Sequence, residues 1–140
     1  MYRLDEAVRR VDIGLSNVDL DQYRTASSRI DVACAHNPLN LADMSGRAVF
    51  EACRSDGVPF VPFFPLGSAF HAENPVLGTP SVKVTANRLG ATPAQVALAW
   101  LLHLAPTVLL IPATSSMLHL EENLAAADLL LDAEALDVLP

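Results

Sequence analysis

Short apolar runs alternate with helix-like segments along this chain, and that order restricts its possible folds more than any other property of the sequence. The runs cover residues 11–15, 30–36, 58–64 and 107–111. A segment with helical spacing of apolar residues follows each run. Repeated strand–helix order is typical of a parallel sheet, because a crossover helix must return the chain to the start of the next strand. The sequence therefore predicts an α/β fold with about four βα units.

The best-defined helix begins after Thr92. Thr92 can cap this helix, Pro93 suits its first position, and Gln95 completes a capping box. Gly57 is suited to end an earlier helix in a left-handed conformation. Further helices are expected over residues 19–28, with Asp19 as the cap, over 45–55, 82–89 and 117–127, and after residue 132.

The third expected strand contains two prolines, Pro59 and Pro62. Neither can donate a ladder hydrogen bond, so both are awkward within a sheet. The connection after this strand, residues 65–90, is typical of a long βα loop that carries function. Residues 4–10 resemble the end of a helix with no strand before it, so we expect the architecture to begin in mid-repeat.

Composition and charge exclude several classes of protein. With 140 residues, 51% of them hydrophobic and 18% charged, the chain is expected to form one domain, residues 1–140, around a buried core. Nine Lys and Arg against sixteen Asp and Glu give a net charge of −7, which argues against nucleic acid or an anionic membrane as the main partner. Three prolines, Pro93, Pro106 and Pro112, interrupt the uncharged stretch 89–120, so no membrane span is expected.

The cysteine and histidine content favours a reducing compartment and no metal centre. Two cysteines, Cys34 and Cys53, make no disulfide framework, and the start of the chain has no apolar signal-peptide region. The expected location is the cytoplasm. The four histidines fit no zinc spacing, so no metal site is predicted.

Four βα units are half of what a closed eight-stranded barrel needs, and such a barrel takes about 250 residues. An open half leaves two edge strands and an apolar inner face uncovered. We therefore expect the chain to form a homodimer or to pair with a complementing barrel half.

Four segments are more specific than the alternation of strands and helices, because their order and spacing together match those of a known family. They are IGLSNV at 13–18, PLG at 65–67, TPAQVALAW at 92–100, and IPATSS at 111–116 continuing into HLEENL at 119–124. With these segments the chain resembles the C-terminal half of an aldo/keto reductase, from about residue 4 to residue 140. The resemblance implies a truncated oxidoreductase: a partial (β/α)8 TIM barrel, its second half, from a family that reduces carbonyls by hydride transfer from NADPH.

The resemblance also implies which residues hold the cofactor. Ser16 and Asn17 match the pair that bonds the nicotinamide carboxamide, and Phe63 matches a ring that stacks on the nicotinamide. The other matching positions are Leu66, Gly67 and Ser68 beside the pyrophosphate, Thr114 and Ser115 at the 2′-phosphate, and Glu122 and Asn123 at the adenine. Physical chemistry is compatible with these roles, since hydroxyls before a helix suit an anion and an amide suits a carboxamide.

Three positions depart from the family pattern within the expected cofactor site. His36 stands where the family commonly has Gln, Ala113 where it has Lys or Gly, and His119 where many members have Arg. Loss of two cations near a phosphate should weaken discrimination for NADPH over NADH. The resemblance therefore implies NADPH as cofactor, with NADH as an open alternative.

No catalytic residue can be assigned. The family's catalytic Asp, Tyr, Lys and His lie on the first four strands, which this chain does not match, and Tyr2 and Tyr23 are not at corresponding positions. Two functional hypotheses follow. In the first, the chain is the NAD(P)H-binding half of a reductase, inactive alone; in the second, it is a noncatalytic half-barrel module or remnant that dimerises and binds nucleotide or protein.

The proposed ligand positions also have plain structural interpretations. Ser16 and Asn17 can form an ordinary turn after a strand. Thr114 and Ser115 can belong to a helix cap, and Phe63 can be a core residue. The sequence alone does not decide between these structural roles and the cofactor-binding roles.

Overall fold

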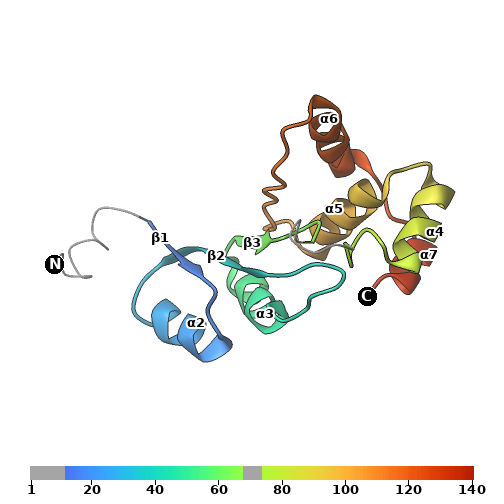
Figure 1. The fold of residues 1–140 in the computed structure, drawn as a ribbon. Coiled ribbons are helices and arrows are strands. Elements are labelled where there is room, and N and C mark those ends of the chain that lie inside the picture. The colour runs from blue at the N-terminus through green and yellow to red at the C-terminus, as the bar shows by residue number, and fades with distance from the viewer. Residues whose placement is uncertain (1–11, 68–73) are drawn as a thin grey trace.

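The computed structural model describes residues 12–67 and 74–140. Three strands, β1 (Ile13–Ser16), β2 (Val32–Pro38) and β3 (Phe60–Phe63), form a parallel sheet in the order β1-β2-β3 (Figure 1). The helices are α2 (Leu20–Ser27), α3 (Arg47–Asp56), α4 (Pro80–Leu89), α5 (Pro93–Leu104), α6 (Met117–Ala125) and α7 (Ala133–Val138), with a 3-10 turn at Ala126–Asp128. The partial α/β fold predicted from the sequence is confirmed. The expected helix end at residues 4–10 lies outside the described residues.

The prediction of a fourth strand over residues 107–111 is wrong, because this segment does not form an extended strand. It is reduced to one parallel bridge between Phe60 and Val108, in which Phe60 N donates to Thr107 O at 3.0 Å and Leu109 N donates to Phe60 O at 2.9 Å. Pro62, two residues further along β3, presents its backbone in the same direction and has no N–H to donate. The ladder therefore stops after one bridge.

The predicted capping signals are confirmed in the helices that they begin. The side chains of Asp19 and Gln22 form a capping box at the start of α2, and Thr92 and Gln95 form another at the start of α5. Gly57 ends α3 in the left-handed region, with φ of 71°. Helix α4 begins at Pro80 rather than at residue 82. Each box satisfies backbone N–H groups that a helix start leaves free, so these boundaries are set locally.

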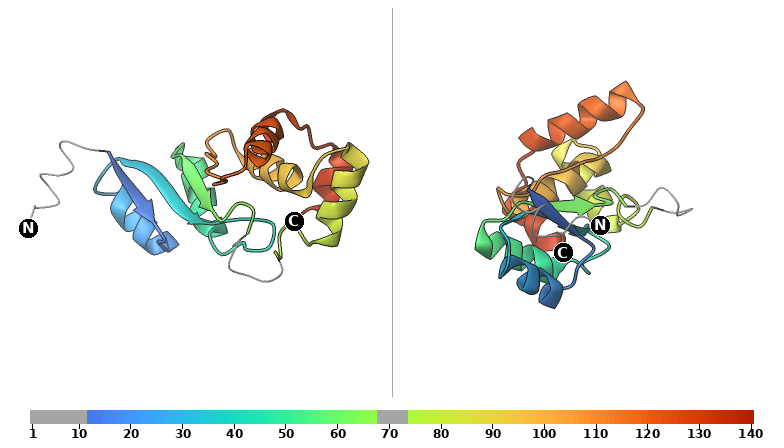
Figure 2. Two further views of the ribbon diagram at one scale, coloured as in Figure 1. Left: turned by 45° about the horizontal axis from the view of Figure 1, so that its top comes forward. Right: turned by 90° about the vertical axis from the view of Figure 1, so that its left-hand side faces the viewer.

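The core lies between the sheet and the helices that follow it. Phe50 of α3 packs edge-to-face on Phe60 of β3, with ring centroids 5.4 Å apart. Helix α5 is the most enclosed helix, and Trp100 on it donates a hydrogen bond to Pro140 O at 2.9 Å. Helices α2 and α3 lie on the same face of the sheet, while α4 and α7 lie at the end of the molecule far from β1 (Figures 1 and 2). The described part of the chain is thus elongated along the direction in which its units succeed one another.

The opposite face of the sheet carries a second set of side chains, which we call the inner face. Three observations place residues on it: a Cβ on Gly14 would lie 2.8 Å from Cys34 Sγ, the ring of His36 contacts that of Phe63, and His36, Phe63 and Ile111 line one cavity. Strand alternation adds the remaining members. The inner face consists of Gly14, Ser16, Cys34, His36, Val61, Phe63, Leu109 and Ile111.

Helix α6 has no buried residue, and Met117, Leu118 and Leu124 on it are strongly exposed. Figure 2 shows it projecting from the body that α4, α5 and α7 form. Within residues 12–67 and 74–140, no helix is both long and apolar enough to span a bilayer.

Candidate functional site

Two adjoining cavities lie beyond the carboxyl ends of β2 and β3. The first has a volume of about 320 Å³, and the second a volume of about 250 Å³. They share Leu66 and Ala113, so together they form one trough from the sheet toward α6. Ligand sites of parallel α/β folds lie at this end of the strands, because the loops that vary most freely meet there.

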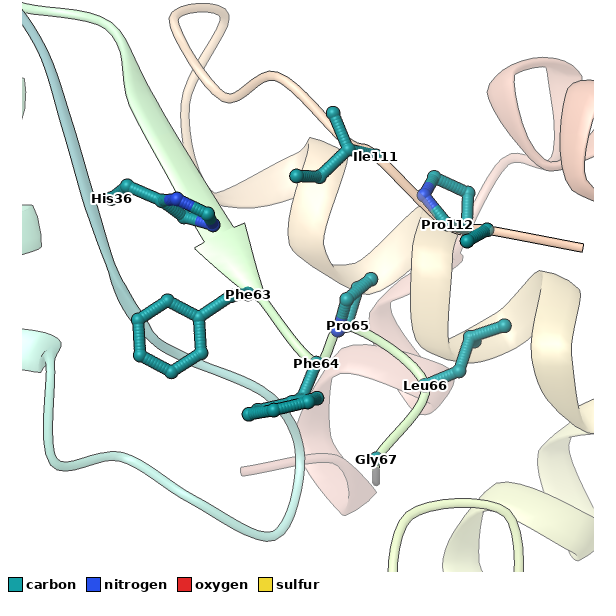
Figure 3. Close-up of a pocket in the computed structure, with 9 residues that line it drawn as sticks. His36, Phe63, Phe64, Pro65, Leu66, Gly67, Ile111 and Pro112 are labelled. Carbon is teal, nitrogen blue, oxygen red and sulfur yellow. The ribbon is translucent and has the colours of Figure 1, made fainter. Parts of the chain in front are cut away.

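The first cavity is mostly apolar. It is enclosed by His36 at the end of β2, by the segment 63–67 at the end of β3, and by residues 111–113 (Figure 3). His36 and Phe63 stand on one side of it, opposite Ile111 and Pro112 (Figure 3). The rings of His36 and Phe63 meet edge-to-face with centroids 5.0 Å apart. This arrangement suits a flat ligand with few polar groups.

His36, which lines the first cavity, carries a buried polar atom that lacks a partner. Its Nε2 is buried and makes no hydrogen bond within the described structure. A buried ring nitrogen without a partner is costly, and most such atoms in native proteins are satisfied by protein, water or ligand. If the imidazole turned toward the cavity, a hydrogen bond between a ligand group and Nε2 would remove this cost.

The second cavity is more polar. Helix α6 contributes His119, Glu122 and Asn123, and Thr114 lies beside them. The floor is formed by Leu66, Leu77 and Ala113 together with the start of α5 at Thr92, Pro93 and Ala94. None of the residues lining either cavity in the described part of the chain is a lysine or an arginine. The polar side chains that line the two cavities therefore carry hydroxyl, amide, imidazole and carboxylate groups, and none of them is a permanent cation.

The structure brings together most of the residues predicted for the cofactor site. His36, Phe63, Leu66 and Gly67 line the first cavity. Thr114, His119, Glu122 and Asn123 line the second. Ser68 lies outside the described residues.

Three predicted residues do not line either cavity. Ser16, the last residue of β1, and Asn17, which follows it, are exposed. Asn17 adopts a left-handed φ of 53°, and its N–H donates to His36 O at 2.9 Å. Ser115 is exposed at the end of the loop before α6. The neighbouring hydroxyls serve the helix start instead: Thr114 Oγ1 accepts from Ser116 N, and Ser116 Oγ accepts from His119 N.

Three asparagines bind loop backbone near the carboxyl ends of the strands, and the sequence did not predict this role for any of them. Asn37 clasps the backbone of Val18, donating from Nδ2 to the carbonyl at 2.6 Å and accepting at Oδ1 from the N–H at 3.1 Å. Asn40 Nδ2 donates to Phe64 O at 3.0 Å. Asn74 Nδ2 donates to Leu66 O at 2.7 Å. The available signal was the position of Asn37 and Asn40 directly around the end of a buried strand, where amides commonly bond loop backbone.

Gly67 has a conformational reason to be glycine. Its φ is 82°, its N–H donates to Phe64 O at 2.9 Å, and a Cβ there would lie 2.7 Å from Asn74 Oδ1. Phe64, at the other end of this turn, also has a positive φ of 54°. Non-glycine residues adopt such angles rarely and at a cost, and outliers of this kind cluster at ligand sites.

The shifted pKa values lie away from the trough. Burial raises the pKa of the Tyr23 hydroxyl, which donates to Asp56 Oδ2 at 3.0 Å between α2 and α3. Burial also raises the pKa of the nearby Cys53 thiol. Tyr23 thus has a structural role, and it faces neither cavity.

The fold and the site together define part of a parallel β/α barrel whose candidate ligand site lies at the carboxyl ends of its strands. The aldo/keto reductase family model matches residues 11–139. The chain belongs to this family. A partial TIM barrel is thereby confirmed as its fold.

Curated relatives agree with this assignment. The chain is 45% identical over 127 residues to pyridoxine 4-dehydrogenase of Escherichia coli, covering 91% of this chain and 43% of the relative. It is 34% identical over 122 residues to an uncharacterized oxidoreductase of Schizosaccharomyces pombe, covering 87% of this chain and 39% of the relative. The chain thus spans about two fifths of the length of these relatives.

Solved structures show the same partial coverage. The thermostable aldo-keto reductase Tm1743 matches with a TM-score of 0.83 at 30% identity, over 96% of this chain and 50% of that protein. An aldo-keto reductase of Klebsiella pneumoniae, solved in complex with NADPH, matches with a TM-score of 0.80 at 28% identity, over 90% and 45%. These matches cover 90% or more of this chain and about half of each solved protein.

Proposed function

We propose that this chain is the cofactor-holding half of an aldo/keto reductase, forming one half-barrel domain over residues 1–140. Its cofactor would be NADPH, with NADH accepted as well. The observation that carries the proposal is the trough of two cavities, whose first part is lined by the aromatic rings of His36 and Phe63 and whose second part is polar. When bound, the nicotinamide would supply the hydride for reduction of a carbonyl.

The residues present suit this group. The imidazole of His36 would turn toward the carboxamide and form a hydrogen bond with it, and the ring of Phe63 would lie against the nicotinamide. Leu66 and Gly67 line the first cavity, where they would lie beside the pyrophosphate. Glu122 and Asn123 would bond the adenosine end, and Thr114 would face the ribose or its phosphate. Ser16, Asn17, Ser68 and Ser115 belong to the proposed site only through the family resemblance.

The same lining explains why we propose NADH as well as NADPH as a cofactor. A 2′-phosphate is held most strongly by guanidinium or ammonium groups, through charge-assisted hydrogen bonds. Here the described lining offers Thr114 and His119, and the carboxylate of Glu122 opposes an added phosphate. We therefore expect a smaller preference for NADPH over NADH than a site with Lys or Arg would show.

The chain would reduce carbonyls only with a complementing half, because no described residue lining the trough is a tyrosine or lysine that could serve as proton donor. The exposed inner face gives the second hypothesis its support: a noncatalytic module would cover that face by association and bind nucleotide or protein without turnover. We propose the cytoplasm as its location, where the two free cysteines would stay reduced.

Calorimetric titration of the purified chain with NADPH, and separately with NADH, tests the proposal. We expect binding, and a loss of about tenfold in affinity in His36→Ala, which removes the imidazole that lines the first cavity and its hydrogen bond to the carboxamide. The matched control is His103→Ala, because His103 is an exposed residue of α5 outside both cavities. Absence of binding to a well-folded sample, or equal affinities of the two variants, would reject the proposed site and favour the noncatalytic hypothesis.

A further inference from the structure

The turn over residues 64–67 joins β3 to the wall of the first cavity. Phe64, Leu66 and Gly67 of this turn line that cavity, and Figure 3 shows them following Phe63 along the chain. The turn is closed by Gly67 N, which donates to Phe64 O at 2.9 Å. A change in the backbone angles of Phe64 would rotate Leu66 and Gly67 relative to β3. The position of this part of the cavity wall therefore depends on the conformation of Phe64.

Phe64 has a backbone conformation that it would not adopt by itself. Its φ is 54°, in the left-handed region that non-glycine residues rarely occupy. Pro65 follows it, and a residue before proline normally has an extended backbone. Burial of the ring offsets little of this cost, because Phe64 is 50% exposed. Strain of this kind persists only where surrounding contacts impose it, and it is found most often at ligand sites.

The contact that imposes this conformation comes from Asn40, in the loop between β2 and α3. Asn40 Nδ2 donates to Phe64 O at 3.0 Å, so this carbonyl accepts two hydrogen bonds and both of its lone pairs are engaged. The amide is itself fixed, since its Oδ1 accepts from Ala42 N and Asp43 N, both at 2.9 Å. Asn40 is also buried. The bond to Phe64 therefore has a defined direction.

Asn74 holds the other end of the turn in the same way. Its Nδ2 donates to Leu66 O at 2.7 Å, and its Oδ1 accepts from Val76 N at 3.0 Å and from Leu77 N at 3.1 Å. Each asparagine thus binds nearby backbone with its oxygen and a turn carbonyl with its nitrogen. Donors engage the carbonyl oxygens of Phe64 and Leu66, which weakens their repulsion of an anion beside the turn. The turn is therefore suited to a ligand with an anionic group.

We propose that Asn40 and Asn74 are positioning residues for the cofactor, because they hold the strained turn 64–67 in place beside the pyrophosphate. The proposal rests on the proposed function in taking a nicotinamide nucleotide as the ligand. Neither asparagine lines either cavity, so each acts through the turn rather than by contact with the cofactor. A segment that is already ordered costs less to bind, and this gain in affinity is lost when the segment relaxes.

The test replaces each asparagine by aspartate, which keeps the oxygen that binds nearby backbone but removes the N–H that holds the turn. Asn87→Asp makes the same chemical change on the exposed side of α4 and is the matched control. Hydrogen exchange of the Gly67 amide, measured by NMR without nucleotide, should be about tenfold faster in Asn40→Asp and Asn74→Asp than in the wild-type chain. Asn87→Asp should leave this rate unchanged.

Affinity measurements separate positioning from a general loss of structure. In calorimetric titrations of folded samples, Asn40→Asp and Asn74→Asp should bind NADPH about tenfold more weakly than the wild-type chain. Adenosine 2′-monophosphate has neither pyrophosphate nor nicotinamide, so its affinities for all these proteins should agree within about threefold. Asn40→Ala and Asn74→Ala, which add no negative charge, should show the same pattern.

Equal affinities of the variants and the control for NADPH would overturn the proposal and leave the proposed function standing. A parallel loss of affinity for NADPH and for adenosine 2′-monophosphate would also overturn it, because a general loss of structure acts on both cavities. A Gly67 amide that exchanges at the wild-type rate in every variant would show that the asparagines do not hold the turn. A wild-type chain that binds neither NADPH nor NADH would reject the proposed function and this inference together.

Discussion

Removal of the Asn37 side chain should release the loop between β1 and α2. Asn37 is 4% exposed, and its amide makes two hydrogen bonds to the backbone of Val18, 19 residues away. A typical hydrogen bond contributes about 0.5–1.5 kcal/mol net, so the pair contributes about 1–3 kcal/mol. Val18 is only partly buried, so water can satisfy its backbone in the variant. We therefore expect Asn37→Ala to lower the free energy of unfolding by about 2 kcal/mol.

Asn37→Asp sharpens the prediction, because it keeps the shape and the acceptor but removes the donor. At neutral pH it places a carboxylate against Val18 O, where the wild-type amide donates at 2.6 Å. It should therefore be at least as destabilising as Asn37→Ala at pH 7, and less so in acid, where a protonated carboxyl can donate. Equilibrium urea unfolding, followed by circular dichroism, measures both variants, with Asn87→Ala on the exposed side of α4 as the control. A change below about 0.5 kcal/mol in Asn37→Ala would refute the reasoning.

Three further predictions concern other parts of the chain. Gly67→Ala should lower the free energy of unfolding by more than Gly57→Ala in urea titrations: both residues have positive φ, but only at Gly67 does a new Cβ meet a neighbour within 3 Å. Because Arg88 lowers the pKa of Asp132 to about 2, the stability from this pair should be complete above about pH 4 and lost as the pH falls toward 2, and thermal unfolding of Asp132→Asn should lack this component. Tyr23→Phe should cost about 1 kcal/mol, measured by the same urea titration, because its buried hydroxyl bonds a carboxylate.

The sequence predicted the site residues that lie at the ends of neighbouring strands. It did not predict the side chains that form hydrogen bonds to backbone far along the chain. His36 and Phe63 lie at the carboxyl ends of strands that the apolar runs already indicated, and Leu66 and Gly67 follow the second of these strands. Their meeting at one end of the sheet was therefore predictable. Asn40 and Asn74 were not predicted as loop supports, because each bonds a backbone carbonyl whose position depends on the packed sheet. Their role in shaping the trough is visible only in three dimensions.

The sequence by itself determined the order of strands and helices, the two capping boxes and the left-handed end of α3, because these depend on residues within a few positions of one another. Only the tertiary structure decided that residues 107–111 make a single bridge, since that outcome requires Pro62 to stand beside them on the neighbouring strand. It also decided that Ser16 and Asn17 lie outside both cavities. Local hydrogen bonds can be predicted from the spacing of residues, whereas the pairing of strands and the position of cavities depend on packing between distant segments.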